Sequence, residues 1–227
     1  MFFKHAVTLL SWAALLSVPV LADASVRSWQ WSGDGDELTM YRANGSVTWE
    51  LSEGSLLLDN SKKSLVAGKV RRPGGFVLAP GKWGDVTFSV DGRSLASEVT
   101  VNRDVCLIFG YQDETHFYYA HLSRNSDGKY HTVLMRVDGD SRTVIHEAIE
   151  IGVDKGPLVS SKENKRWQNF RVTHRKDGRI AVYVDDMQVP VLKAKDVTYP
   201  VGRLGCGTFD DPAMFKNLRV SGTRLDG

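Results

Sequence analysis

The sequence lacks the features that would assign it at once to a common class of protein. No stretch after residue 24 sustains the helical period of 3.6 residues, and no long apolar run follows the N-terminal one. The charges nearly balance, with 29 Lys and Arg residues against 27 Asp and Glu residues. This balance leaves neither a basic footprint for nucleic acid nor an acidic tail, so net charge names no partner.

The first 24 residues have the organisation of a secretory signal peptide. Lys4 precedes a run of apolar residues, and Ala22-Asp23-Ala24 places small residues at the two positions that a signal peptidase reads. The apolar run is shorter than the roughly 20 residues of a membrane helix, and Pro19 interrupts it. We therefore expect residues 1–24 to be removed, the protein to be secreted or periplasmic without a membrane span, and residues 25–227 to form one domain.

Cysteine is scarce, which leaves two interpretations open. The chain contains only Cys106 and Cys206, and an even number in an exported protein permits one disulfide. Two buried free thiols are the alternative, because free cysteine behaves as a small apolar side chain. The sequence does not decide between the two.

Short runs of β-branched and aromatic residues fill the rest of the chain. Together they predict an all-β fold, a two-sheet antiparallel β-sandwich rather than a parallel α/β fold. Four Asp-Gly pairs, at Asp91, Asp127, Asp138 and Asp177, predict hairpin turns between such runs. The expected strands cover Val47–Leu51, Asp85–Val90, Val105–Tyr111, His116–Leu122, Tyr130–Val137, Trp167–His174, Arg179–Val184 and Met214–Val220.

Three segments carry a family resemblance: DVCLIFGYQDETHFYYAHL at 104–122, GRIAVYV at 178–184 and VGRLGCGTFDDPAMFKNLRV at 201–220. They resemble secreted bacterial concanavalin A-like domains of the 3-keto-disaccharide hydrolase (DUF1080) group, also described as family 16 glycoside hydrolase-like. The resemblance covers the chain from about Trp83 to its end. It implies a jelly roll whose curved face carries a glycan groove, with carbohydrate, an oligo- or polysaccharide, as the partner.

The sequence departs from this resemblance at two places. The Glu-x-Asp-x-x-Glu strand motif of family 16 glycoside hydrolases is absent, so we reject that chemistry. Relatives often have an aspartate where Lys216 stands, and some members of the superfamily bind a structural calcium near this end. Lys216 disfavours calcium, and we expect no cofactor, with Asp210 and Asp211 as weak metal candidates.

The candidate ligand-binding residues lie on and beside the strand at 116–122. Alternation puts His116, Tyr118, Ala120 and Leu122 on one face, which the apolar pair makes the core face. Tyr119 and His121 would then face a groove, where aromatic rings pack on sugar C–H groups and polar groups bind hydroxyls. The alternative is that these side chains simply pack within the sandwich. The complete candidate set is Tyr111, Tyr119, His121, His131 and Arg136.

Motifs for other chemistry are missing from the sequence. No Gly-x-Ser-x-Gly elbow, zinc-protease helix or phosphate loop occurs. His116 and His121 are five residues apart in a strand, so their side chains point to opposite faces. We therefore expect no metal site shared by these two histidines and His131. Two hypotheses remain: an exported carbohydrate-active domain that binds a glycan or hydrolyses a sugar derivative, and a non-catalytic laminin G-like interaction module.

Overall fold

A computed structural model describes residues 25–42, 47–59, 71–97, 99–147, 150–152, 154–159 and 166–225. The predicted signal peptide lies outside these residues. Within them, no helix is long and apolar enough to cross a membrane. The elements are β1 (Val26–Gln30), η1 (Gly35–Glu37), β2 (Thr39–Arg42), β3 (Thr48–Ser52), β4 (Ser55–Asp59), β5 (Gly75–Leu78), β6 (Trp83–Ser94), β7 (Asp104–Asp113), β8 (His116–Ser123), β9 (Val133–Asp138), β10 (Ser141–Val144), β11 (His146–Glu147), β12 (Gln168–His174), β13 (Arg179–Val184), β14 (Leu192–Lys195), β15 (Val201–Thr208) and β16 (Ala213–Arg224).

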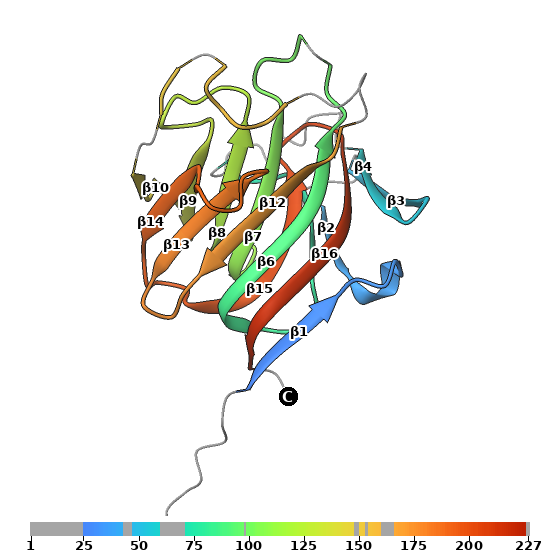
Figure 1. Ribbon diagram of the computed structural model, residues 1–227, viewed down its shortest axis with the longest axis vertical. Helices are drawn as coiled ribbons and strands as arrows, with labels where there is room; N and C mark the ends of the chain where they lie inside the picture. Colours follow the sequence, from blue (N-terminus) through green and yellow to red (C-terminus); the bar gives the residue numbers. More distant parts are fainter. Residues whose placement is uncertain are drawn as a thin grey trace, which may run out of the picture.

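The strands form two packed antiparallel sheets (Figure 1). The β7 sheet has the order β10-β9-β8-β7-β15-β5-β2. The β6 sheet has the order β3-β4-β16-β6-β12-β13-β14-β11, with β1 alongside β16. The two sheets join at one corner, where Val201 and Gly202 of β15 pair with Gly84 and Trp83 of β6. The predicted all-β antiparallel sandwich is confirmed.

The main core lies between the two sheets and follows from the alternation of apolar residues along the strands. Phe88 and Val90 of β6 meet side chains of β7 and β8 such as Phe109, Tyr118 and Ala120, and all five are fully buried. Burying such side chains supplies the main stabilisation of the fold, about 1.5–3 kcal/mol for each large apolar residue.

A second apolar cluster covers the other face of the β7 sheet, which an antiparallel sheet often exposes to water. Its centre consists of Phe76 of β5, Ile108 of β7, Phe117 and Tyr119 of β8, and Met135 of β9, all nearly inaccessible to solvent. The central strands of the β7 sheet are therefore buried on both faces. A side chain on these strands can therefore point away from the main core and still be buried.

Three of the four Asp-Gly pairs lie at or near turns, and one does not. Asp91-Gly92 lies inside β6 rather than at a hairpin, which corrects the prediction. A Cβ atom on Gly92 would lie 3.0–3.2 Å from the rings of Phe170 and Phe215. The glycine is thus explained by close packing of two aromatic rings in the core, and Asp91 accepts hydrogen bonds from the side chains of Asn169 and Asn217.

The two cysteines are both free and buried. Cys106 belongs to the outer cluster of the β7 sheet, whereas Cys206 on the neighbouring strand belongs to the core between the sheets. Their side chains therefore point to opposite faces of one sheet, which no disulfide can bridge without moving the backbone.

We predict that neither thiol reacts with a bulky disulfide reagent in the folded protein and that both react after unfolding. Burial raises the pKa of both Cys106 and Cys206, which keeps them as unreactive thiols. Thiol titration with and without denaturant, in the absence of reductant, measures this. A count of zero thiols under both conditions would instead reveal a disulfide.

Candidate functional site

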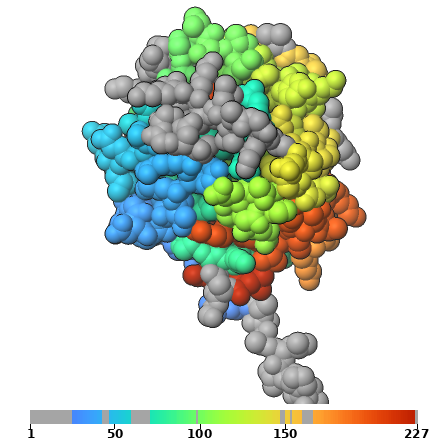
Figure 2. All heavy atoms as spheres, turned by 180° about the vertical axis from the view of Figure 1, so that it is seen from behind, coloured from blue at the N-terminus to red at the C-terminus, as the bar shows by residue number. Residues whose placement is uncertain are grey.

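A pocket of about 520 Å³ opens beside the ends of β7 and β8. Figure 2, which shows the side opposite to Figure 1, places the green segment before β7 next to the yellow-green segment after β8. The pocket walls combine basic, acidic and aromatic side chains. They are Arg71, Thr100, Asn102, Asp104, His121, Tyr130, His131, Arg142, Phe209, Asp210 and Asp211.

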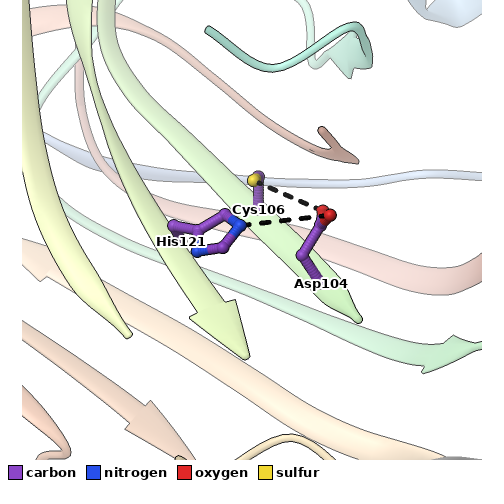
Figure 3. A group of neighbouring side chains, drawn as sticks. All are labelled: Asp104, Cys106 and His121. Atoms are coloured by element: carbon purple, nitrogen blue, oxygen red, sulfur yellow. Dashed lines mark hydrogen bonds and ion pairs between the residues drawn. The ribbon is translucent and has the colours of Figure 1, made fainter. Parts of the chain in front are cut away.

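The β7–β8 hairpin brings three polar side chains together, and two of them, Asp104 and His121, line this pocket. Asp104 and Cys106 are two residues apart on β7 and so share a face, and Cys106 lies directly opposite His121 of β8. Figure 3 shows the three side chains pointing toward one another. Asp104 Oδ2 is 3.9 Å from His121 Nε2, and Cys106 Sγ is 3.9 Å from Asp104 Oδ1.

Asp104 is a buried carboxyl group with only 1% of its surface exposed. Its Oδ1 atom accepts a hydrogen bond of 2.6 Å from the backbone N–H of Phe209, while Oδ2 has no hydrogen-bond partner. Burial raises the pKa of Asp104 well above its ordinary value, and the negative charge of Asp211 adds to the effect. Burial therefore disfavours the charged form of this carboxyl group.

Burial also keeps the neighbours of Asp104 uncharged. Desolvation lowers the pKa of His121 to about 3, with the positive charge of His131 as the next cause. Desolvation and the charge of Asp104 raise the pKa of the Cys106 thiol. Nucleophilic catalysis by cysteine requires a thiolate. The pair Cys106 and His121 consequently lacks the ionisation state of a cysteine nucleophile and its base.

A tight turn fixes His131 at the rim. Asp127 Oδ1 accepts hydrogen bonds from the backbone N–H groups of Lys129, Tyr130 and His131, and its Oδ2 lies 2.7 Å from His131 Nδ1. Partial burial opposes ionisation of Asp127, but these hydrogen bonds together hold its pKa below the ordinary value. The turn leaves Nε2 of His131 as the ring atom not engaged by the aspartate.

Two arginines supply positive charge on the other side of the pocket. Arg71 lies 3.7 Å from a carboxylate oxygen of Asp210, and its guanidinium lies 5.7 Å from the centre of the Phe209 ring. Arg142 donates to the Arg71 carbonyl at 3.0 Å and to the Tyr119 hydroxyl at 3.1 Å. The pocket therefore presents charges of both signs to any molecule within it.

The structure brings together two of the five predicted ligand-binding residues. His121 and His131 both line the pocket, with ring centres 5.9 Å apart. Tyr119 lies on the predicted face but is only 1% exposed, which corrects the expectation that it faces an open groove. The alternation was interpreted correctly, but the outer aromatic cluster covers this face of the sheet.

The other two predicted residues lie elsewhere. Tyr111 packs edge-on against Phe76 in the outer cluster, where burial raises its pKa to about 12. Arg136 is on β9 and forms an ion pair of 2.5 Å with Asp196. Neither lines the pocket. His116, as predicted, is separate from the other two histidines and interacts with Asp113.

The weak metal candidates Asp210 and Asp211 lie at the pocket beside Asp104. One carboxylate oxygen from each of the three residues lies within 4.8 Å of the others, a donor set whose chemistry suits an oxygen-preferring cation such as calcium. Lys216 does not line this pocket, because its ammonium lies 4.2 Å from the centre of the Trp167 ring. The lysine therefore has no bearing on these carboxylates.

Sequence reasoning missed Asp104, Arg71, Arg142 and Phe209. Asp104 could have been found from its two-residue spacing to Cys106, which puts both on one strand face. The two arginines and Phe209 come from segments distant in the chain, so no local pattern would have identified them.

Comparisons with known proteins show the fold and no family. No family model matches the chain, and no curated protein matches it. Among solved structures, the carbohydrate-binding module CBM66 from Bacillus subtilis is similar, with 18% identity, a TM-score of 0.55, and coverage of 81% of this chain and 94% of that one. A Bacillus subtilis protein of unknown function with a galectin-like fold has 14% identity, a TM-score of 0.54, and coverage of 86% and 96%. The chain thus has a concanavalin A-like fold, which carbohydrate-binding modules share.

Proposed function

We propose that this protein binds a glycan, without cleaving it, in the pocket beside β7 and β8, and that it does so outside the cytoplasm. The observation that carries the proposal is the combination of hydrogen-bonding groups of both charge signs with aromatic surface in one open pocket. The signal peptide predicted at residues 1–24 supports the location. The shared fold supports the ligand class by analogy alone.

The pocket walls offer what a sugar needs. Tyr130 is 61% exposed at the rim and presents a flat apolar ring for sugar C–H groups. Asn102, Asp210 and Arg71 offer acceptors and donors for hydroxyl groups. An arginine and a carboxylate side by side can bind neighbouring hydroxyls in a defined orientation.

The burial of Asp104 argues for binding without hydrolysis. Asp104 has a raised pKa, as a general acid requires. Its surface is only 1% exposed, and both its oxygens are inaccessible or engaged, so it cannot reach a glycosidic oxygen. The carboxyl group whose environment best suits a general acid is therefore out of reach of a sugar in the pocket.

Hydrolysis of a sugar derivative is the second candidate function. It is favoured by the proximity of Asp104, whose pKa is raised, to Asp210 and Asp211, since glycoside hydrolysis uses a pair of neighbouring carboxyl groups. The resemblance to 3-keto-disaccharide hydrolases would fit this function. It requires a movement that exposes Asp104.

We expect the purified protein to bind at least one sugar on a glycan array and to release no product from it. Tyr130→Ala should weaken that binding about tenfold or more, because it removes the exposed ring. Asp210→Asn should do the same by removing the carboxylate that faces Arg71. Calorimetry with the array hit, and product analysis by chromatography, measure the two properties.

Tyr183→Ala is the matched control, because Tyr183 lies on β13 in a different groove. It should leave the affinity unchanged. Product release would support the hydrolase, and absence of binding to any glycan would support the laminin G-like interaction module. Equal affinities for the Tyr130 and Tyr183 variants would place the glycan outside this pocket.

A further inference from the structure

Three side chains that could each donate one metal-binding atom, two of them lining the pocket, belong to different chemical classes. Asp104 offers an oxygen, Cys106 a sulfur and His121 a nitrogen, and one such atom from each lies within 4.8 Å of the others. All three come from one hairpin, in which strand alternation and cross-strand register aim them at a common point (Figure 3). This convergence does not depend on mobile loops.

The distance between Asp104 and His121 fits two ligands of one metal ion better than it fits a hydrogen bond. The separation of 3.9 Å between Asp104 Oδ2 and His121 Nε2 is too long for a hydrogen bond. Donors bound to one ion at about 2.0–2.3 Å lie about 3–4 Å apart. An ion between them would satisfy both atoms at once.

Asp104 Oδ2 is a buried atom without a partner, which points to a missing ligand. The other oxygen of the same carboxyl group accepts a hydrogen bond from the backbone N–H of Phe209, and Oδ2 lies 3.9 Å from His121 Nε2. Leaving a buried acceptor unpaired costs about 1–3 kcal/mol. A bound cation would remove that cost.

The alternative donor set of Asp104, Asp210 and Asp211 is less suited, because Asp210 and Asp211 already have partners. Asp211 Oδ2 accepts a hydrogen bond of 2.9 Å from the backbone N–H of Asp104, and Asp210 lies beside Arg71. A thiol and an imidazole select transition metals over calcium or magnesium. The unpartnered atom, Asp104 Oδ2, therefore favours the donor set that contains the Cys106 thiol and the His121 imidazole.

We propose that Asp104, Cys106 and His121 bind one divalent transition metal ion of the zinc class. Thiolate and carboxylate would balance the two positive charges, and the thiol proton, together with any proton on the Asp104 carboxyl group, would pass to solvent as the metal–ligand bonds form. Asp104 and His121 line the pocket, which gives the ion access and leaves a coordination position facing the space where a ligand would lie. This proposed metal site does not require that the protein binds a glycan.

Cobalt is the probe for this site, because a thiolate bound to cobalt gives a charge-transfer band in the near ultraviolet. Titration of the metal-free full chain with Co²⁺ should produce this band with a stoichiometry of one ion, and Zn²⁺ should displace it. Zn²⁺ should also raise the thermal unfolding midpoint. Cys106→Ser should abolish the band and weaken Zn²⁺ binding by more than the about 10–100-fold typical of outer-shell changes.

Cys206→Ser is the matched control, because it replaces the other buried cysteine, on the opposite face of the neighbouring strand. It should retain both the band and the affinity. His121→Ala should lose both, which tests the site with a second variant if Cys106→Ser is unstable. No band with the wild type, or Zn²⁺ affinity unchanged in Cys106→Ser, would overturn the proposal. If the protein instead bound calcium, and only Asp211→Asn lost that binding, the metal site would be the oxygen donor set of Asp104, Asp210 and Asp211.

Discussion

Gly205→Ala is expected to destabilise the protein by at least about 3 kcal/mol, a large fraction of the about 5–15 kcal/mol by which a domain is ordinarily stable. A Cβ atom at this position would lie 1.8 Å from the backbone oxygen of Val77 on β5. That distance is far below van der Waals contact, and the obstacle is the backbone of a strand that is hydrogen-bonded to neighbours on both sides. Denaturant unfolding, or the yield of folded protein, measures the effect.

Two further glycines make this prediction specific. Gly207→Ala should behave like Gly205→Ala, because its Cβ atom would lie 2.0 Å from the backbone oxygen of Gly75. Gly139→Ala places the methyl group in open space at a φ of +62° and should cost only about 1 kcal/mol of backbone strain. Equal midpoints for Gly205→Ala and Gly139→Ala would show that β15 and β5 do not approach as closely as described.

Acidification from pH 7 to pH 4 is expected to remove up to about 3 kcal/mol of stability through His174 alone. This histidine is 1% exposed, with its ring edge-on to Tyr118 and Phe109. Burial lowers its pKa to about 4, although the nearby Asp196 partly opposes the shift. Between pH 6.5 and pH 4 the unfolded chain binds a proton that the folded protein excludes, so stability rises with pH across this window.

His174→Gln isolates this contribution, because other buried groups titrate too. Asp104 acts in the opposite direction, since its raised pKa stabilises the folded state at low pH. The wild type should therefore lose more stability than the variant between pH 7 and pH 4, whatever the absolute slopes. An NMR titration of the His174 ring gives a second measurement. A His174 pKa near 6.5 in the folded protein would contradict the assignment.

Much of the fold could be predicted from the sequence, because local alternation dictates which side chains share a sheet face. The runs at 116–122 and 167–174 became β8 and β12, and Tyr118, Ala120 and Leu122 occupy the core face as expected. Alternation separates the two faces of a strand but does not say what covers each face. Tyr119 was therefore placed on the correct face and wrongly expected to be exposed.

The candidate site depends on a register that local sequence does not specify. In an uninterrupted hairpin starting from the pair Asp113 and His116, Cys106 would face Ser123. An irregularity between Phe109 and Asp113 shifts the pairing, so that Cys106 faces His121. Gly110 permits it with a φ of +57°, where a Cβ atom would lie 2.7 Å from the Tyr199 oxygen.

The sequence by itself determined the strands, their two-faced character and the presence of Asp104, Cys106 and His121 on one hairpin, since all of these follow from period-two geometry and nearby turns. Tertiary structure alone decided that those three donors converge, that Arg71 and Phe209 enclose them, and that Cys206 points away. These outcomes depend on a bulge and on contacts between segments remote in the chain, where the energy of packing rather than any local preference selects the arrangement.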